Sequence, residues 1–298
     1  MALRSLEPEN EQTARILLRQ GRSDSACRIL ESSMATKAKT YGSDSIEFQE
    51  ASIENIESLL QNVVMLVESK KYDAAVVPLN KILSWTSPGE NSLPIQEPNK
   101  SQYRAIAFFL NGCVEKGKNN YESSLQYYMN AAPFFESCGM VSELVASYIG
   151  ASHTLMALDR DDEALIHLRT AYDLLSSPDV SPNVANPVHE AMAYIYMKKG
   201  QFEKAKESLE MAIKTRTLTE FLPKFRIEQS RCSSANSTHS AGSGPKPPSA
   251  TSGGARFRAN MARQKRGSNS SVKKEIGHLP IKELGQLKIS VNRLMSCV

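Results

Sequence analysis

The sequence has none of the short motifs that usually organise catalysis. It lacks the glycine patterns of nucleotide-binding loops and the serine elbow of hydrolases, and its five histidines do not show the spacing of a metal site. Acidic residues gather at 159–163 without the alternation of a calcium-binding loop, and acids at the start of a helix favour the helix dipole. We therefore expect a protein that is not an enzyme and that holds neither a metal ion nor a cofactor.

Cysteine and long apolar runs are also scarce. The five cysteines are scattered and none forms a CxxC pair, which is typical of reduced thiols in the cytoplasm or nucleus. No stretch approaches the roughly 20 apolar residues of a membrane span, and residues 1–4 begin no long apolar run of the kind found in signal peptides. We expect a cytoplasmic protein that is not secreted and does not span a membrane.

Acidic residues are rare after residue 222. Residues 223–298 hold 14 Lys and Arg against 3 Asp and Glu, a net charge of +11, whereas residues 1–222 hold 22 and 29, a net charge of −7. The overall charge of +4 hides this division. The acidic region disfavours nucleic-acid binding, because such surfaces need Lys and Arg. The basic tail offers a route to the nucleus.

What the chain does have is a short pattern that recurs five times. The clearest copy runs from Tyr196 to Ala212. In this copy Gly200 permits a tight bend, Phe202 fills the seam between two helices, and Ala205 and Ala212 are small where the helices touch. The small residue recurs at positions 26, 75, 124, 164 and 205. The other copies supply further packing residues: Tyr72, Ala75, Gly112, Tyr121, Ala131, Ala164 and Ala171.

This pattern resembles the tetratricopeptide repeat family, whose unit of about 34 residues carries Gly, aromatic and Ala residues at fixed offsets. The match is good at 105–138 and 186–219, fair at 56–89 and 145–178, and poor at 7–40. Spacings of 40 to 49 residues between small positions exceed the usual period and are loosely similar to those of kinesin light chain-like adaptors.

The resemblance implies an all-α, right-handed solenoid of about five helix pairs over residues 1–222. Turns are expected near Gly21, Lys70, Lys118, Asp159 and Gly200. Two features depart from the family pattern: the tryptophan of the first helix is absent, and Asp161 stands where the fourth unit should have its turn aromatic.

In this family the first helix of each unit lines a concave groove, and the resemblance assigns the groove positions. They are Leu60, Val64, Phe109, Cys113, Ile149, His153 and Tyr194, with Lys116, Met156 and Met197 one turn further along. The Lys, Asn and Arg set that clamps a carboxylate in some members is absent, so the groove suits an apolar or amphipathic peptide. The alternative is that the register is off by one residue and these side chains belong to the core between helices.

The last part of the chain changes character. Residues 223–274 form a basic linker rich in Ser, Gly and Pro, which we expect to be disordered because it has too little apolar surface to bury. Within it, Ser268 follows basic residues in a pattern typical of a kinase site. Residues 275–298 predict a short amphipathic helix, whose apolar face is Leu284, Leu287, Val291 and Leu294 in line with Pro280, with Ile276 and Met295 as candidates to extend it. Opposite charges predict an intramolecular contact between this helix and the groove; the alternative is that it binds another protein.

These observations favour a scaffold or adaptor that binds a protein or peptide partner in the groove of its repeats. Two other hypotheses stay open. A regulatory or targeting subunit of an enzyme complex would have the same sequence features. An RNA-binding repeat protein is disfavoured by the acidic charge of the repeat region.

Overall fold

The computed structural model describes residues 7–216, 294, 295, 297 and 298, and within these it contains helices and no strand. The helices are α1 (Glu7–Arg19), α2 (Ser23–Tyr41), α3 (Ile46–Glu68), α4 (Tyr72–Thr86), α5 (Asn99–Gly117), α6 (Tyr121–Ser137), α7 (Val141–Ala157), α8 (Asp161–Leu174) and α9 (Ala185–Lys198). A short 3₁₀ turn at Pro182–Val184 leads into α9, and residues 202–216 are helical as well.

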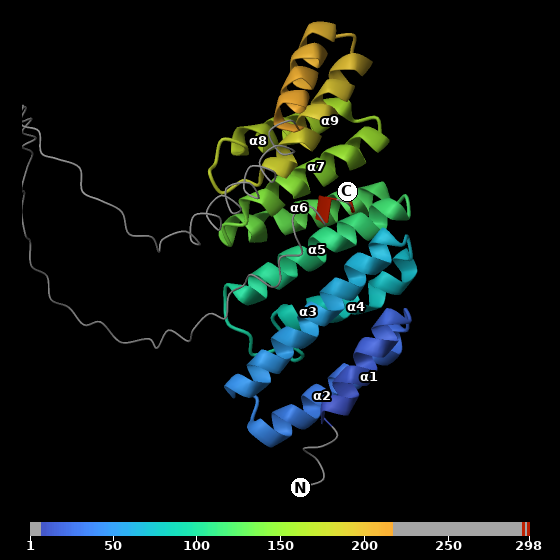
Figure 1. Ribbon diagram of the computed structural model, residues 1–298, viewed down its shortest axis with the longest axis vertical. Coiled ribbons are helices and arrows are strands. Elements are labelled where there is room, and N and C mark those ends of the chain that lie inside the picture. The colour runs from blue at the N-terminus through green and yellow to red at the C-terminus, as the bar shows by residue number, and fades with distance from the viewer. Residues whose placement is uncertain (1–6, 217–293, 296) are drawn as a thin grey trace, which may run out of the picture. The chain divides into compact units, whose positions relative to one another are not determined.

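The helices follow one another as antiparallel pairs in a single stack (Figure 1). The pairs are α1 with α2, α3 with α4, α5 with α6, α7 with α8, and α9 with residues 202–216. The described residues therefore confirm the prediction of an all-α repeat solenoid with five helix pairs. The predictions for the linker, for Ser268, and for Leu284, Leu287 and Val291 concern residues outside the described ones.

Each turn within a pair is closed by a residue in the left-handed helical conformation. These residues are Gly21, Lys70, Asn119, Asp159 and Gly200, with φ between 56° and 75°. The next N–H reaches back to the carbonyl five residues earlier, as Gln201 does to Tyr196 at 2.8 Å. This geometry satisfies carbonyls that the helix end leaves without partners. The turns thus lie at the predicted places, within one residue.

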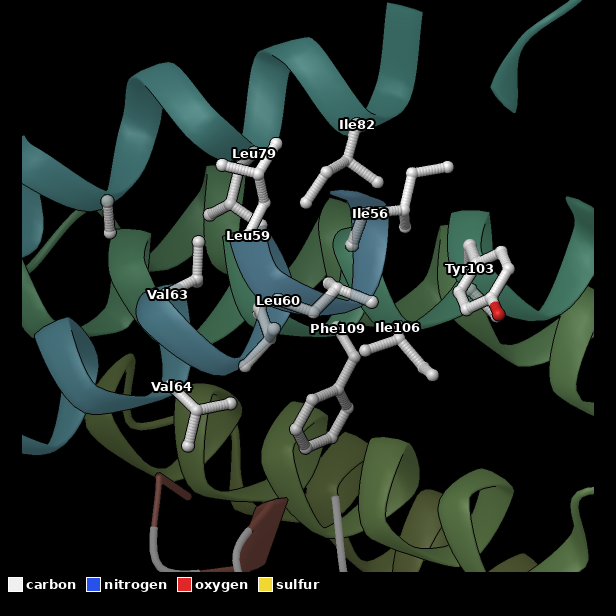
Figure 2. Close-up of a cluster of buried hydrophobic side chains, with 14 of the residues drawn as sticks. Ile56, Leu59, Leu60, Val63, Val64, Leu79, Ile82, Tyr103, Ile106 and Phe109 are labelled. Carbon is white, nitrogen blue, oxygen red and sulfur yellow. The ribbon is translucent and has the colours of Figure 1, made fainter. Parts of the chain in front are cut away.

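The side chains between the helices form a continuous apolar core. Figure 2 shows part of it, where α3, α4 and α5 meet, with side chains from all three helices directed toward one another. The labelled residues are Ile56, Leu59, Leu60, Val63, Val64, Leu79, Ile82, Tyr103, Ile106 and Phe109. Each unit buries its apolar faces against its neighbours, so the core is shared between units and runs along the whole stack.

One tyrosine packs three helices of the central repeats together. Tyr128 of α6 is fully buried, and its ring lies against Gly112 of α5 and Gly150 of α7. A Cβ at Gly112 would lie 2.8 Å from the ring, and one at Gly150 would lie 2.7 Å from it. Real Cβ atoms do not approach so closely, so this packing requires glycine at both positions. A related contact joins the second and third units, where the ring of Tyr72 covers Gly117.

Most of the predicted packing residues lie where helices touch. Six alanines are buried, with relative exposures of 4% or less: Ala75, Ala131, Ala164, Ala171, Ala205 and Ala212. Tyr72 and Tyr121 are half-buried. The prediction for Phe202 needs correction, because its side chain is 70% exposed. Tyr72, at the equivalent position, packs on the next unit along the chain, and the described residues include no further unit to cover Phe202.

The departure at Asp161 is compensated by a charged partner. The Asp161 carboxylate lies 2.9 Å from the Lys198 ammonium, and the same ammonium lies 2.9 Å from Asp159. Lys198 stands seven residues before Ala205, as Gly117 stands seven residues before Ser124. The seam between the fourth and fifth units therefore contains the ion pair of Asp161 and Lys198. At the equivalent positions of the seam between the second and third units, the ring of Tyr72 packs on Gly117.

Candidate peptide-binding face

Four of the seven predicted groove residues lie in the core. Leu60, Val64, Phe109 and Ile149 each have 0% exposure. The ring of Phe109 packs edge-on against Tyr128, with the ring centroids 5.4 Å apart, and against Phe135 at 6.3 Å. Helix α5 turns this position toward its own partner α6. The structure thus corrects the expectation that these four side chains line an open groove.

The other three groove residues occupy one equivalent position in successive units. Cys113, His153 and Tyr194 each precede the small residue of their unit by eleven positions. Cys113 is buried, His153 is half-buried, and Tyr194 is 54% exposed. One turn further along, Lys116 and Met156 are half-buried and Met197 is 46% exposed. This row on α5, α7 and α9 therefore opens progressively toward the fifth unit.

The last described residues of the chain lie on the covered part of this row. Leu294 is 1% exposed and belongs to the same core cluster as α5 residues. Met295 and Val298 pack against both buried clusters of the repeats, and Cys297 against one. In Figure 1 this segment, drawn in red, lies at the middle of the stack. A peptide segment is thus already seated on the first helices of the third and fourth units.

Two polar side chains hold the backbone of this segment. Lys116 Nζ donates a hydrogen bond to the backbone oxygen of Val298, and His153 hydrogen-bonds the backbone of the same residue. Within the segment, Cys297 N donates to Leu294 O at 3.1 Å and Val298 N donates to Met295 O at 3.2 Å. The segment is therefore a short turn that satisfies the N–H groups of Cys297 and Val298 and presents a backbone oxygen of Val298 to the repeats.

Burial lowers the pKa of both polar side chains that meet this segment. Burial lowers the pKa of His153 to about 4, the Lys116 ammonium lowers it further, and the hydrogen bond with Val298 opposes both effects. Burial likewise lowers the pKa of Lys116. His153 is consequently neutral at neutral pH.

The nearby thiol does not have the properties of a nucleophile. Burial is the main cause that raises the pKa of Cys113 to about 12, and Cys297 adds to the rise. The Tyr128 hydroxyl donates a hydrogen bond to Cys113 Sγ at 3.4 Å. A thiol of this kind stays protonated at neutral pH, and the thiolate is the reactive form.

The turn and small residues of the fifth unit match a known repeat model. The model describes a tetratricopeptide repeat and covers residues 187–216. The four preceding helix pairs repeat the same helix–turn–helix arrangement, so the chain is a tetratricopeptide-repeat-like solenoid. A search of curated proteins gives no match for the chain.

Tetratricopeptide repeats generally mediate protein interactions. No cluster of potential metal ligands occurs among the residues that the structure describes. Within the same residues, every helix is too short or too polar to cross a membrane. The acidic side chains between residues 159 and 163 form ion pairs rather than a metal site. Asp162 pairs with Lys199, and Glu163 pairs with Arg160.

Sequence reasoning named the row on α5, α7 and α9 and predicted that the C-terminal helix contacts the groove. Of the predicted apolar face, the described residues include Leu294, which is 1% exposed, and Met295 beside it packs on the repeats as well. Cys297 and Val298 were not predicted to meet the row, and the only signal for them was an apolar residue at 298 after the predicted face.

Proposed function

We propose that the protein is a non-catalytic scaffold that binds a peptide partner along the row formed by α5, α7 and α9. The observation that carries this proposal is the segment 294–298, because Lys116 and His153 hold its backbone and the repeats bury Leu294. A face that accommodates one apolar turn in this way has the properties of a peptide-binding surface.

The fifth unit supplies the open part of this surface. Tyr194 and Met197 occupy the positions equivalent to Cys113 and Lys116, and about half of each side chain is exposed. Aromatic residues and methionine are enriched in protein interfaces, and tyrosine is frequent among the residues that dominate binding energy. We therefore expect the partner to be an apolar or amphipathic peptide that contacts Tyr194 and Met197.

The test compares the proteins that co-purify with the full chain and with Tyr194→Asp/Met197→Asp. A matched control is Ile166→Asp on α8, because Ile166 is 60% exposed and lies outside the row. We expect the double variant to lose partners that both the wild type and the control retain, with no change in helicity by circular dichroism. A partner set that is identical in all three chains would contradict the proposal. An active enzyme among the lost partners would instead identify the protein as a targeting subunit.

A further inference from the structure

We propose that the face between α5 and α7 is a binding site for a short apolar turn, and that its occupant is residues 294–298 of the same chain. A partner peptide that reaches this part of the row must displace the segment. The displacement rests on the proposed function, whereas the contact within the chain stands without it.

The site recognises two features of its occupant. The first is an apolar anchor: Leu294 is 1% exposed among the core side chains, and Met295 and Val298 pack beside it. The second is a backbone oxygen: Val298 O accepts a hydrogen bond from Lys116, and His153 contacts the backbone of the same residue. The internal hydrogen bonds of the turn leave this oxygen available to the repeats. The ligand chemistry is therefore a hydrophobic turn with a backbone oxygen directed at the repeats.

The side chains around the site explain why it favours such an occupant. Lys116 and His153 come from adjacent units and both meet the backbone of Val298, so they hold that residue at a defined place. The apolar surroundings make an unsatisfied polar group there costly. A hydrophobic turn buries apolar surface and satisfies both polar side chains at once.

The occupant can come from the same chain because its length permits it. Between the last described helical residue, 216, and residue 294 lie 77 residues. The entropic cost of closing a loop increases only slowly with its length, so a modest binding free energy at residues 294–298 offsets the cost of closing this connection. A tethered segment also has an effective concentration up to the millimolar range, which lets it compete with free peptides.

The first experiment uses a fluorescent peptide of residues 285–298 and the full chain. In the wild type the segment already occupies the site, so we expect weak binding. In full-length Leu294→Asp the segment should leave, and the peptide should bind at least about tenfold more tightly. The same peptide with Leu294→Asp should not bind to either chain. Ile166→Asp is the control and should behave like the wild type.

Equal and weak binding of the peptide to all these chains, at up to millimolar concentration, would overturn the proposal. Since Leu294 is part of the core cluster, a second variant covers the case in which Leu294→Asp unfolds the chain. Lys116→Met keeps apolar bulk but removes the donor, so Val298 should be held less tightly. Its amide exchange at residues 294–298 should increase at least about tenfold, with Lys39→Met as the exposed-lysine control. Unchanged exchange in Lys116→Met would count against the site.

A third measurement distinguishes a contact within one chain from a contact between two copies of the chain. Cys297 lies near enough to Cys113 to raise the pKa of its thiol, so a short thiol-to-thiol cross-linker should join them. In a mixture of isotopically labelled and unlabelled chains, we expect cross-linked peptides of one label alone, and none from Cys297→Ser. Peptides of mixed label would overturn the assignment within one chain and identify a second copy as the donor. If these results hold while Tyr194→Asp/Met197→Asp retains every partner, the site stands and the proposed function fails.

Discussion

The packing of Tyr128 between two glycines predicts that a single methyl group will destabilise the central repeats. In Gly150→Ala the new Cβ would lie 2.7 Å from ring atoms of Tyr128. The ring cannot move far, because Gly112 packs on it from α5. A Cβ built at Gly112 would itself lie only 2.8 Å from ring atoms of Tyr128. Helices α5 and α7 thus bracket the ring from two sides.

Two opposing terms set the magnitude. Overpacking a well-packed core costs about 1–3 kcal/mol. Alanine is preferred to glycine inside a helix by about 1 kcal/mol. Because the ring is bracketed, the steric term should be at the upper end of its range. We therefore expect Gly150→Ala to lower the free energy of unfolding by about 1–2 kcal/mol.

A double-mutant cycle tests the cause of this loss. Tyr128→Leu removes the ring and leaves space for the methyl group, at its own cost in stability. In that background, the helix preference alone remains, and Gly150→Ala should stabilise the chain by up to about 1 kcal/mol. The substitution thus changes sign, which corresponds to a coupling energy of about 2–3 kcal/mol between the two positions.

Urea unfolding followed by circular dichroism at 222 nm measures these differences. Gly139→Ala is the control, since its φ is +69° and a Cβ there meets nothing within 4 Å. It should lose about 1 kcal/mol in both backgrounds, because alanine is strained in this conformation. If Gly150→Ala has the same effect with Tyr128 and with Leu at position 128, the contact with the ring is not the cause.

Two further predictions concern a turn and a titrating group. Lys70 has φ +57° at the turn between α3 and α4, so Lys70→Gly should stabilise the chain by about 0.5 kcal/mol, whereas Lys70→Ala should not; urea unfolding checks both, and equal effects would refute the strain. His153 has a folded pKa of about 4 against an ordinary value of 6.5, so its contribution to stability is full above pH 6.5 and is lost as the pH falls toward 4. Between pH 7 and pH 5 this loss is at most about 2 kcal/mol. His153→Gln should flatten that part of the pH profile of unfolding, and an unchanged profile would refute the assignment.

Local sequence determined the elements and the turns of this protein. The recurrence of small residues at 26, 75, 124, 164 and 205 predicted five helix pairs, because helices approach closely only where side chains are small. Gly21 and Gly200 marked turns because a left-handed residue ends many helices. Both signals act over a few residues and can be read without knowledge of the rest of the chain.

Tertiary structure decided which face each residue takes. Phe109 and Ile149 are one turn from Cys113 and His153, yet the former pack toward the partner helix and the latter toward residues 294–298. A helix with apolar residues on several sides does not reveal its orientation, because rotation about its axis depends on both neighbouring helices. The sequence therefore assigned seven residues to a groove, and the structure places four of them in the core.

The contact at Lys116 depended wholly on tertiary structure. Lys116 and Val298 are separated by 182 positions, and neither residue belongs to a motif that predicts their hydrogen bond. The same holds for Asp161 and Lys198, which replace an aromatic packing contact by an ion pair across a seam. Local patterns determine helices because their hydrogen bonds are local, whereas contacts between distant residues exist only after the units have stacked and brought them together.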